Sequence, residues 1–495
     1  MMESPANINS STVSLLLVQS LVVSRFLLIS PILWQHYFHC CFILQSQDEE
    51  DRISALPTDV LLKILEHLDL CMLVRTSVLS TRWRHLPHQL PCLDINVTCS
   101  HSTASRRQIM GPYKSATRLI SHACNCTRDL VINRLRLVFY LLVPWLCSIG
   151  CAVDDIASSG KTKCLEFVIF PSCDRPSKPQ LAEFGQQLMS FSRTYPITFE
   201  WLTGLTLNSL AFGDSDIPSL INASHRLERL SFRFCNLVKY SVLKIDAPCS
   251  RLHTLEFIGF RCARIELISV PELRRLECHS CLKENPPVRF GYVPQLHDVV
   301  LASRAKAWQT PVALGEFMSG IASNLSILCL NFSCQTIWVR PEHPGQRTPI
   351  FSNLRDVCFY NIFVECDLNW TLFILEAAPS LQKFHLSRHS CVNGSEDTDE
   401  KTNVVWEPSK NFKHSNLKLM VMNGFNGEKK VMDYVRLVME RAVGLKRIEL
   451  SNKHMCVKCN ALEYPRKFLV DDATKHRVNE LLTHGFSSAV EIIID

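Results

Sequence analysis

The chain has 495 residues, and its 53 basic and 47 acidic side chains leave a net charge of +6. So small an excess makes no strong case for nucleic-acid binding, which usually needs a concentrated basic face. Hydrophobic residues form 47% of the chain and charged residues 20%, a balance that supports a large core and argues against wholesale disorder.

The 23 cysteines are scattered without paired spacing. Many stand in apolar runs typical of strands, among them Cys278, Cys329 and Cys358. Free cysteine behaves as a small buried hydrophobe, and scattered free thiols are typical of a reducing compartment. We therefore expect the protein in the cytoplasm, the nucleus or both.

Residues 1–48 are expected to lie outside the fold. The segment 13–34 is largely apolar and nearly long enough to span a bilayer. Arg25 and Pro31 interrupt it, and no Lys or Arg precedes Arg25, whereas a signal peptide begins with basic residues. Two interpretations stay open, an accessory leader with no role in the fold and a membrane anchor.

Residues 53–86 are predicted to form a block of three short helices. Pro57 suits the first turn of a helix, where a missing N–H costs nothing, and Asp59 favours the positive end of the helix dipole. The apolar side chains that follow share one face of this helix, and they are Val60, Leu61, Ile64, Leu65 and Leu68. A second helix is expected over Met72–Leu79, and a third carries Trp83. So short a block buries little surface and is marginal without a partner or a following domain.

Beyond this block a six-residue unit, Leu-x-x-Leu-x-apolar, recurs along the chain. In some copies another apolar residue replaces the second leucine. The first leucines of the copies are Leu90, Leu165, Leu202, Leu227, Leu252, Leu273, Leu296, Leu325, Leu354, Leu381, Leu417 and Leu445. From Leu202 to Leu381 they recur at intervals of 21 to 29 residues. This spacing fits leucine-rich repeats, whose period is roughly 20–29 residues.

The last two apolar residues of each unit are two apart, so both are expected to point to one side of a strand. In the unit at Leu165 these two residues are Val168 and Phe170. A single strand cannot bury that side, but stacked repeats make a parallel sheet over a continuous core. The sequence therefore predicts an α/β solenoid of leucine-rich repeats with a curved parallel sheet.

The segments between these strands are expected to form the convex side of the solenoid. Some read as helical, as at Glu316–Ala322 and Leu372–Ala378, and others read as irregular turns, as at Glu284–Pro287 and Pro341–Pro349. The convex side should thus be partly helical and partly irregular.

The C-terminal region reads as a separate α/β cap over residues 404–495. A polar and acidic stretch, 390–403, precedes it as a surface loop. Within the cap, helices are expected near Glu428–Ala442 and Asp472–Leu482, and an apolar tail follows at Val490–Ile494.

The helical block LPTDVLLKILEHLDLCMLVRTSVLSTRWRHLP (Leu56–Pro87) resembles the F-box of plant F-box/leucine-rich-repeat proteins. The matching pieces are Leu56-Pro57, Asp59–Leu61, Ile64-Leu65, Leu68, Val74–Ser80 and Arg82–Arg84. The family often has a proline and a charged residue after the first helix, where this chain has Asp69–Met72, and this departure puts the turn between the helices in doubt. Later parts of the chain resemble the same family, including an FBD-type region around Trp406–Lys453. On this resemblance residues 49–97 are a short three-helix F-box, 98–403 the repeats and 404–495 an FBD-like cap.

The resemblance implies a non-catalytic receptor subunit that binds a Skp-type adaptor and thereby docks on a cullin-RING ubiquitin ligase. The adaptor contacts carried over by position are Leu56, Pro57, Val60, Leu61, Ile64, Leu65, Leu79 and Trp83. Some of these leucines could instead only pack the three helices together, and for Leu61 and Ile64 the two roles stay open. The repeats would recruit an unknown target protein for ubiquitination.

The residues that flank the inward pair of each repeat should face the open concave surface. The predicted target-binding row consists of Arg229, Arg233, Glu256, Arg275, Glu277, His279, Asp298, Asp356, Tyr360, Lys383 and His385. With neighbours such as Ile258 and Val300 the row mixes both charges with apolar groups, which suits a protein surface better than a phosphate backbone. The alternative for any single residue is a solvated sheet face without a ligand.

Motifs for catalysis or cofactors are not expected in this chain. Cys456-x-x-Cys459 after His454 is half of a zinc site, but no second Cys/His pair follows at matching spacing. None of the 16 glycines stands at the spacing of a phosphate-binding loop. We therefore predict no metal, no cofactor and no nucleic-acid partner.

Two other functions stay open from the sequence. A membrane-anchored repeat protein that binds ligands would rest on residues 13–34 and on sequons such as those at Asn96 and Asn331. An adaptor-independent scaffold would rest on the altered join at Asp69–Met72.

Overall fold

The computed structural model describes residues 55–495 apart from several segments. These segments are 69, 77–80, 99–105, 126–130, 174, 280–285, 304–309, 334–336, 343–350, 390–405, 407–408, 410–411, 453–471 and 486–489. The predicted leader 1–48, Leu79, the acidic loop 390–403, the motif from His454 to Cys459 and most of two predicted turns, at 284–285 and 343–349, therefore lie outside the described residues.

The chain divides into two compact units, which are described separately. Unit 1 comprises the described residues of Met1–Val138 and Cys151–Cys164, and unit 2 comprises Phe139–Gly150 and Leu165–Asp495. Three elements run across the boundary, namely β2 (Ile132–Tyr140), α7 (Val143–Ser158) and β3 (Thr162–Phe170).

Unit 1 opens with the three predicted helices, α3 (Thr58–Glu66), α4 (Leu70–Thr76) and α5 (Thr81–His85). The carbonyl of Pro57 accepts the N–H groups of Val60 and Leu61, each at 3.1 Å, so the proline starts α3 as expected. Helix α4 begins at Leu70, two residues before the predicted start at Met72, so most of the join at Asp69–Met72 is helical. Arg82 of α5 donates to the carbonyl of Leu56 at 2.8 Å, which ties the third helix to the start of the first.

The remainder of unit 1 adds η1 (Leu86–Gln89), β1 (Cys92–Asn96) and α6 (Arg106–Asn125). Strand β1 pairs in parallel with β2, with Leu93 opposite Leu135 and Ile95 opposite Leu137. All four of these side chains are buried, so the two strands share one apolar face. Strand β2 and helix α6 were not expected from the repeat pattern.

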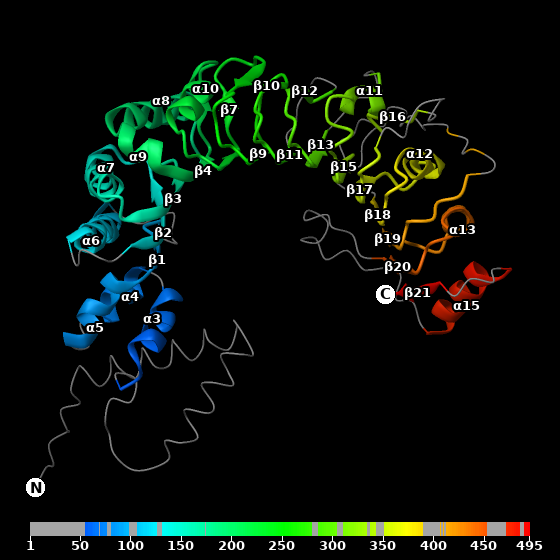
Figure 1. Ribbon diagram of the computed structural model, residues 1–495, viewed down its shortest axis with the longest axis horizontal. Coiled ribbons are helices and arrows are strands. Elements are labelled where there is room, and N and C mark those ends of the chain that lie inside the picture. Colours follow the sequence, from blue (N-terminus) through cyan, green and yellow to red (C-terminus); the bar gives the residue numbers. More distant parts are fainter. Residues whose placement is uncertain are drawn as a thin grey trace, which may run out of the picture. The chain divides into compact units, whose positions relative to one another are not determined.

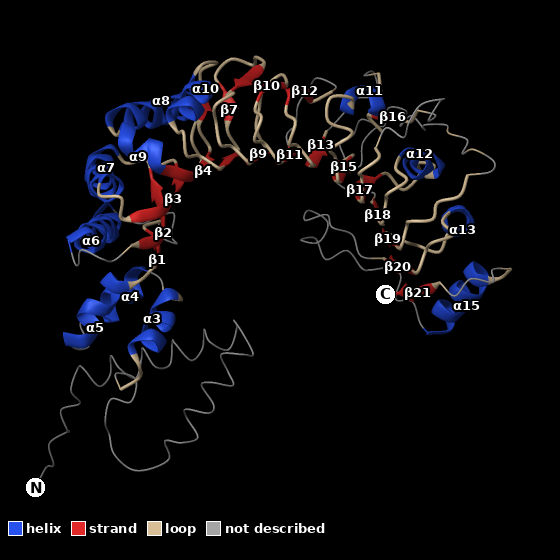
Figure 2. Ribbon diagram, in the orientation of Figure 1, coloured by secondary structure: helices blue, strands red, loops and turns tan. Residues whose placement is uncertain are grey.

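The twelve strands from β3 onward form one run of parallel neighbours along unit 2 (Figures 1 and 2). After β3 they are β4 (Leu202–Asn208), β6 (Arg229–Arg233), β9 (Thr254–Ile258), β11 (Arg275–His279), β13 (Asp298–Ala302), β15 (Ile327–Asn331), β17 (Asp356–Ile362), β18 (Lys383–Arg388), β19 (Leu419–Asn423), β20 (Arg447–Ser451) and β21 (Glu491–Ile494). Each strand from β3 to β20 begins within a few residues of a predicted unit, whereas β21 lies in the predicted apolar tail. The parallel sheet of the predicted repeat solenoid is thereby confirmed.

One strand has the opposite register from the one expected. In β3 the buried side chains are Leu165, Phe167 and Ile169, whereas Val168 and Phe170 point to the other face. Phe167 lies opposite Leu205 and Ile169 opposite Leu207, so the neighbouring strand selects this register. The run Phe167–Phe170 is apolar throughout, and without alternation a one-residue slip exchanges the two faces.

The outer layer of unit 2 contains more strands than the sequence indicated. Three of them, β8 (Leu243–Asp246), β10 (Ile265–Ser269) and β12 (Val288–Tyr292), form a second parallel sheet behind the main one. Two short pairs add β5 (Ala211–Phe212) with β7 (Asn236–Leu237), and β14 (Val312–Ala313) with β16 (Val339–Arg340). The prediction of helices and irregular turns alone was therefore wrong for the middle repeats.

Helices cover the outer side of the other repeats in unit 2 (Figure 2). They are α8 (Lys178–Thr194), α9 (Pro196–Trp201), α10 (Asp216–Ala223), α11 (Leu314–Met318), η2 (Asn369–Leu372), α12 (Phe373–Ala377), α13 (Lys429–Arg441) and α15 (Asp472–Thr483). The predicted helices at Leu372–Ala378, Glu428–Ala442 and Asp472–Leu482 are confirmed to within two residues. Helix α11 ends at Met318, before the end of the predicted stretch Glu316–Ala322.

Stacked aromatic rings occupy the core between the main sheet and the outer layer. Phe232 and Phe257, at matching positions of β6 and β9, lie parallel with ring centroids 5.4 Å apart. Further along, Trp370 stacks on Phe359 at 5.4 Å and meets Phe332 edge-on at 5.6 Å. All five rings are fully buried, so the repeats that carry them are joined to their neighbours by aromatic contact.

In the part of the chain that the structure describes, no helix combines the length and the hydropathy needed to cross a membrane.

Candidate functional site

The predicted adaptor-binding residues divide into an accessible set and a buried set. Pro57 and Val60 are exposed, and Leu56 and Ile64 are partly exposed, all at the start or on one side of α3. Leu61, Leu65 and Trp83 are at most 4% exposed and pack inside unit 1. The accessible four can meet a partner without rearrangement of the helices. The adaptor role of all eight residues stays a prediction, with Leu79 outside the described chain.

The predicted target-binding row lies on the side of the main sheet that faces away from the core. In β9 and β11 every second side chain is buried, and the residues between them, such as Glu256 and Glu277, are partly exposed. The parallel register places the first, third and fifth residues of neighbouring strands side by side, with Thr254 opposite Arg275 and Arg275 opposite Asp298. The row thus runs from β6 to β18 with no predicted member on β15, and Asp298 is its one mostly buried member, at 6% exposure.

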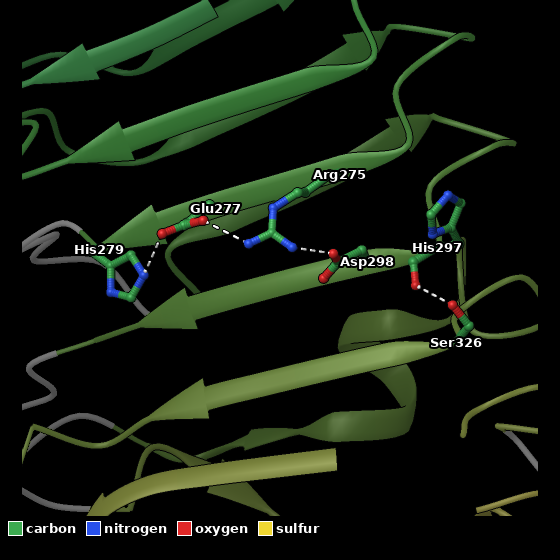
Figure 3. Close-up of polar contacts among 6 residues, drawn as sticks. All are labelled: Arg275, Glu277, His279, His297, Asp298 and Ser326. Carbon is green, nitrogen blue, oxygen red and sulfur yellow. Dashed lines mark hydrogen bonds and ion pairs between the residues drawn. The ribbon is translucent and has the colours of Figure 1, made fainter. Parts of the chain in front are cut away.

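A network of charged side chains joins β11 to β13 at the centre of this row (Figure 3). Arg275 donates to a carboxylate oxygen of Glu277 at 2.9 Å and to Oδ2 of Asp298 on the next strand. Nε2 of His279 lies 3.0 Å from the other oxygen of Glu277. Oδ1 of Asp298 is buried and makes no hydrogen bond. The arginine fork therefore ties two strands together, and it leaves one carboxylate oxygen of Asp298 buried without a partner.

The electrostatics of this network favour its ionised form. The hydrogen bond from His279, and after it the one from Arg275, lowers the pKa of Glu277 to about 2, against the burial that would raise it. Burial also opposes the charge on Arg275, but the hydrogen bond to Glu277 and the charge of Asp298 outweigh burial and raise the pKa of Arg275. Glu277 is consequently a fixed carboxylate over the physiological pH range.

Glu277→Gln is expected to remove a pH-dependent contribution to stability. A carboxyl group whose pKa falls on folding stabilises the fold above its unfolded value of roughly 4.3, and that contribution is lost as the pH falls toward about 2. Because Arg275 is 41% exposed and solvent screens the pair, we expect a loss of about 1–2 kcal/mol at pH 7. Urea denaturation of wild type and variant at pH 7 and pH 3 measures it.

The matched control is Glu491→Gln, since that carboxylate is 63% exposed and lies 3.8 Å from Arg447. We expect this change to leave the unfolding midpoint nearly unaltered at both pH values. An equal loss of stability for Glu277→Gln at pH 3 and pH 7 would contradict the assignment.

A second ion pair crosses the row over a glycine. Glu166 of β3 and Arg229 of β6 flank β4, and their side chains meet at 2.6 Å above Gly204. A Cβ at Gly204 would come within 3.1 Å of Glu166 and 3.5 Å of Arg229. Glu166 was missing from the predicted row because the expected register of β3 was wrong.

Three residues of this face were overlooked at the sequence level. Cys329 and Cys358 are partly exposed at the third positions of β15 and β17, so treating them as buried hydrophobes was wrong, although Cys278 is fully buried as expected. Phe234 is 67% exposed directly after β6 and holds a backbone φ of 56°. The position of the two cysteines within their repeats would have revealed them. The exposure of Phe234 follows from its left-handed backbone conformation, which no sequence pattern predicted.

Among the residues that the structure describes, no group of three or more His, Cys, Asp and Glu side chains is arranged to hold a metal ion. The candidate half-site at Cys456 and Cys459 lies outside those residues.

Two family models match the chain. The F-box domain matches residues 53–93, and the leucine-rich-repeat domain described as At1g61320/AtMIF1 matches residues 186–478, more than half of the chain. The first match includes the helices α3 to α5, and the second runs from within α8 to within α15 and so includes the strands of the main sheet from β4 to β20.

Curated proteins of Arabidopsis thaliana are similar to parts or most of the chain. The putative F-box/FBD/LRR-repeat protein At5g22670 is 34% identical over 90 residues, and the F-box/FBD/LRR-repeat protein At1g51370 is 49% identical over 104 residues. The matched segments are 18% and 20% of this chain, and they span 18% and 22%, about a fifth, of those relatives' own length. The putative F-box/FBD/LRR-repeat protein At3g49030 is 24% identical over 433 residues, which are 82% of this chain and 90% of that protein.

A solved structure of a protein from Bacteroides fragilis covers 78% of this chain and 83% of its own, at 12% identity. Its TM-score of 0.25 is too low to carry an argument about the fold.

Proposed function

The chain belongs to the plant F-box/leucine-rich-repeat proteins, and on that premise we propose that it is the substrate-recognition subunit of an SCF-type cullin-RING ubiquitin ligase. The observation that carries the proposal is the combination within one chain of an F-box match at residues 53–93 and a long repeat domain. The first would bind a Skp-type adaptor and, through it, a cullin. The second would hold a target protein.

The adaptor would bind the accessible side of α3. Leu56, Pro57, Val60 and Ile64 leave apolar surface exposed on a small helical block, and covering that surface would stabilise the block as well as the complex. Leu61, Leu65 and Trp83 would support this surface from within. The chain itself would supply no catalytic group, because its task would be to bring the target to the ligase.

The target would bind the row on the main sheet. Its central carboxylates and Arg275 offer both charges within a few ångströms, while Tyr360 and His385 offer aromatic surface farther along. Such a mixture discriminates between protein partners by complementary charge and shape. A cytoplasmic or nuclear location would follow from this task.

Val60→Glu is expected to weaken capture of a recombinant Skp-type adaptor by at least about tenfold, because a carboxylate buried in an apolar interface loses its hydration without gaining a partner. Val60 is 37% exposed, so the substitution should leave the fold of unit 1 intact. The measurement is adaptor binding by surface plasmon resonance, with circular dichroism to verify the fold.

Val131→Glu provides the matched control, since Val131 is 42% exposed in the same unit and belongs not to α3 but to the residues directly before β2. Wild type and Val131→Glu should bind the adaptor equally. Undiminished binding by a folded Val60→Glu variant, or no binding by the wild-type chain, would count against the proposed function.

A further inference from the structure

Four side chains from three neighbouring strands form a cluster on the face of the main sheet. Cys329 of β15 lies opposite Cys358 of β17, and Cys358 lies opposite His385 of β18. Tyr360 follows two residues after Cys358 and so points to the same side. Both cysteines are free thiols, and all four residues are partly exposed. We call these four residues the thiol cluster.

Cys358 is the central residue of the thiol cluster. Cys329 and His385 lie on the strands on either side of it, and Tyr360 lies two residues along its own strand. The ring of His385 stands edge-on to Tyr360 with centroids 5.1 Å apart, and its Nε2 accepts a hydrogen bond from Nδ2 of Asn423 at 2.9 Å. With Nε2 as acceptor, Nδ1 is the ring nitrogen that carries the proton.

The surroundings of the two thiols shift their pKa values in opposite directions. The hydrogen bond from Cys329, followed by those from His385 and Tyr360, lowers the pKa of Cys358 to about 5, against the burial that would raise it. The hydrogen bond to Cys358 and burial raise the pKa of Cys329. Cys358 is thus the more acidic thiol of the pair.

Other charged groups of the face lie around the cluster. The charge of Asp298 raises the pKa of Cys329, and that of Arg275 lowers it. Asp356 and Lys383, at the first positions of β17 and β18, lie 4.0 Å from one another. Since each of these groups belongs to an opposite-charge pair, none of them stands as an isolated charge beside Cys358.

The spacing of the strands also brings the two cysteines within reach of a covalent bond. Neighbouring strands lie about 4.8 Å apart, and a disulfide joins Cα atoms separated by roughly 4.4–6.8 Å. Cys329 and Cys358 are direct partners in the register of β15 and β17, so the sheet already places them at such a separation.

We propose that Cys358 is a modification site for hydroperoxides, and that Cys329 resolves the product as a disulfide between β15 and β17. The thiolate of Cys358 attacks the peroxide, an S–O bond forms, the O–O bond breaks, and the leaving alkoxide or hydroxide takes a proton from solvent. The sulfur is oxidised to sulfenic acid and the peroxide is reduced. Cys329 then loses its proton, its sulfur attacks that of Cys358, and water leaves. In total two thiols and one hydrogen peroxide give one disulfide and two waters.

The site lies within the row proposed to hold the target, between Asp298 on one side and Lys383 on the other. Oxidation would remove the negative charge of the thiolate from that face and join two repeats. The chemistry can be tested without an adaptor or a target, so its outcome is independent of the proposed function.

The first experiment measures the reactivity of Cys358 in the full-length reduced protein. An ordinary thiol with a pKa of roughly 8.5 is almost wholly protonated at pH 6, whereas the thiolate is the reactive form. Iodoacetamide at pH 6, followed by peptide mass spectrometry, should label Cys358 about tenfold faster than the exposed reference Cys249. His385→Gln should slow the labelling of Cys358 at least about threefold and leave Cys249 unchanged. Equal rates for Cys358 and Cys249 in the wild type would overturn the proposal.

The second experiment follows oxidation by hydrogen peroxide. Wild type should yield a peptide cross-linked through Cys329 and Cys358 that dithiothreitol reverses. Cys329→Ser should instead accumulate a dimedone-reactive sulfenic acid at Cys358, and Cys358→Ser should yield neither product. Buried Cys235, whose pKa burial raises to about 12, serves as the unreactive reference. A wild-type cross-link from Cys358 to another cysteine, or oxidation of Cys235 at the same peroxide dose, would refute the assignment.

Discussion

Gly185→Ala is expected to lower the free energy of unfolding of unit 2 by at least about 3 kcal/mol. Gly185 is buried in α8, where a Cβ would lie 1.8 Å from the carbonyl oxygen of Ala211 and 2.9 Å from its carbonyl carbon. No side chain can move to relieve a clash with backbone, so helix and strand must separate. Because α8 packs on β5, the separation would open the core behind the first repeats of the row.

Chemical denaturation of the full-length variant measures this loss. Gly320→Ala is the matched control, because its Cβ would meet only the carbonyl oxygen of Phe290, at 4.0 Å. That change should alter stability by less than about 0.5 kcal/mol. If the two variants unfold at the same denaturant concentration, the close approach of α8 to β5 is wrong.

Trp370→Ala is expected to lower the free energy of unfolding by about 3–5 kcal/mol, the range for removal of a large buried aromatic ring. Trp370 is fully buried between Phe332, Phe359 and Phe373, with the three ring centroids 5.4–6.3 Å away. Phe359 lies in β17 between Cys358 and Tyr360, so the cavity would open directly beneath the thiol cluster. We therefore expect the last repeats to unfold at lower urea concentration than the first.

Trp370→Phe is the control that separates ring packing from hydrogen bonding. The indole Nε1 is buried without a hydrogen-bond partner, so its removal costs no bond and the phenyl ring retains most of the stacking. We expect Trp370→Phe to lower the free energy of unfolding by less than about 2 kcal/mol. If urea denaturation shows that Trp370→Phe is no more stable than Trp370→Ala, the result would contradict the stacked core.

The repeat pattern predicted where β3 lies but not which of its side chains are buried. The spacing of the leucines located the strands of the main sheet from β3 to β20, because each repeat needs an apolar residue at the same place to continue the core. It did not locate β21, which was predicted only as an apolar tail. In β3 the stretch from Phe167 to Phe170 is apolar on both faces, and only the pairing with Leu205 and Leu207 selected the buried side. The position of Glu166, and its ion pair with Arg229, depended on that choice.

The sequence alone determined the family, the three helices of the first unit and the succession of parallel strands. These follow from local patterns of apolar residues and from a specific motif at Leu56–Pro87, and both can be recognised in the linear sequence. Which residues of the face act together was decided only by the tertiary structure. Arg275 meets Asp298, and Cys329 meets Cys358, across strands that are 23 and 29 residues apart in the sequence. The variable loops between repeats hide that register from the linear pattern, and hydrogen bonding between the strands establishes it.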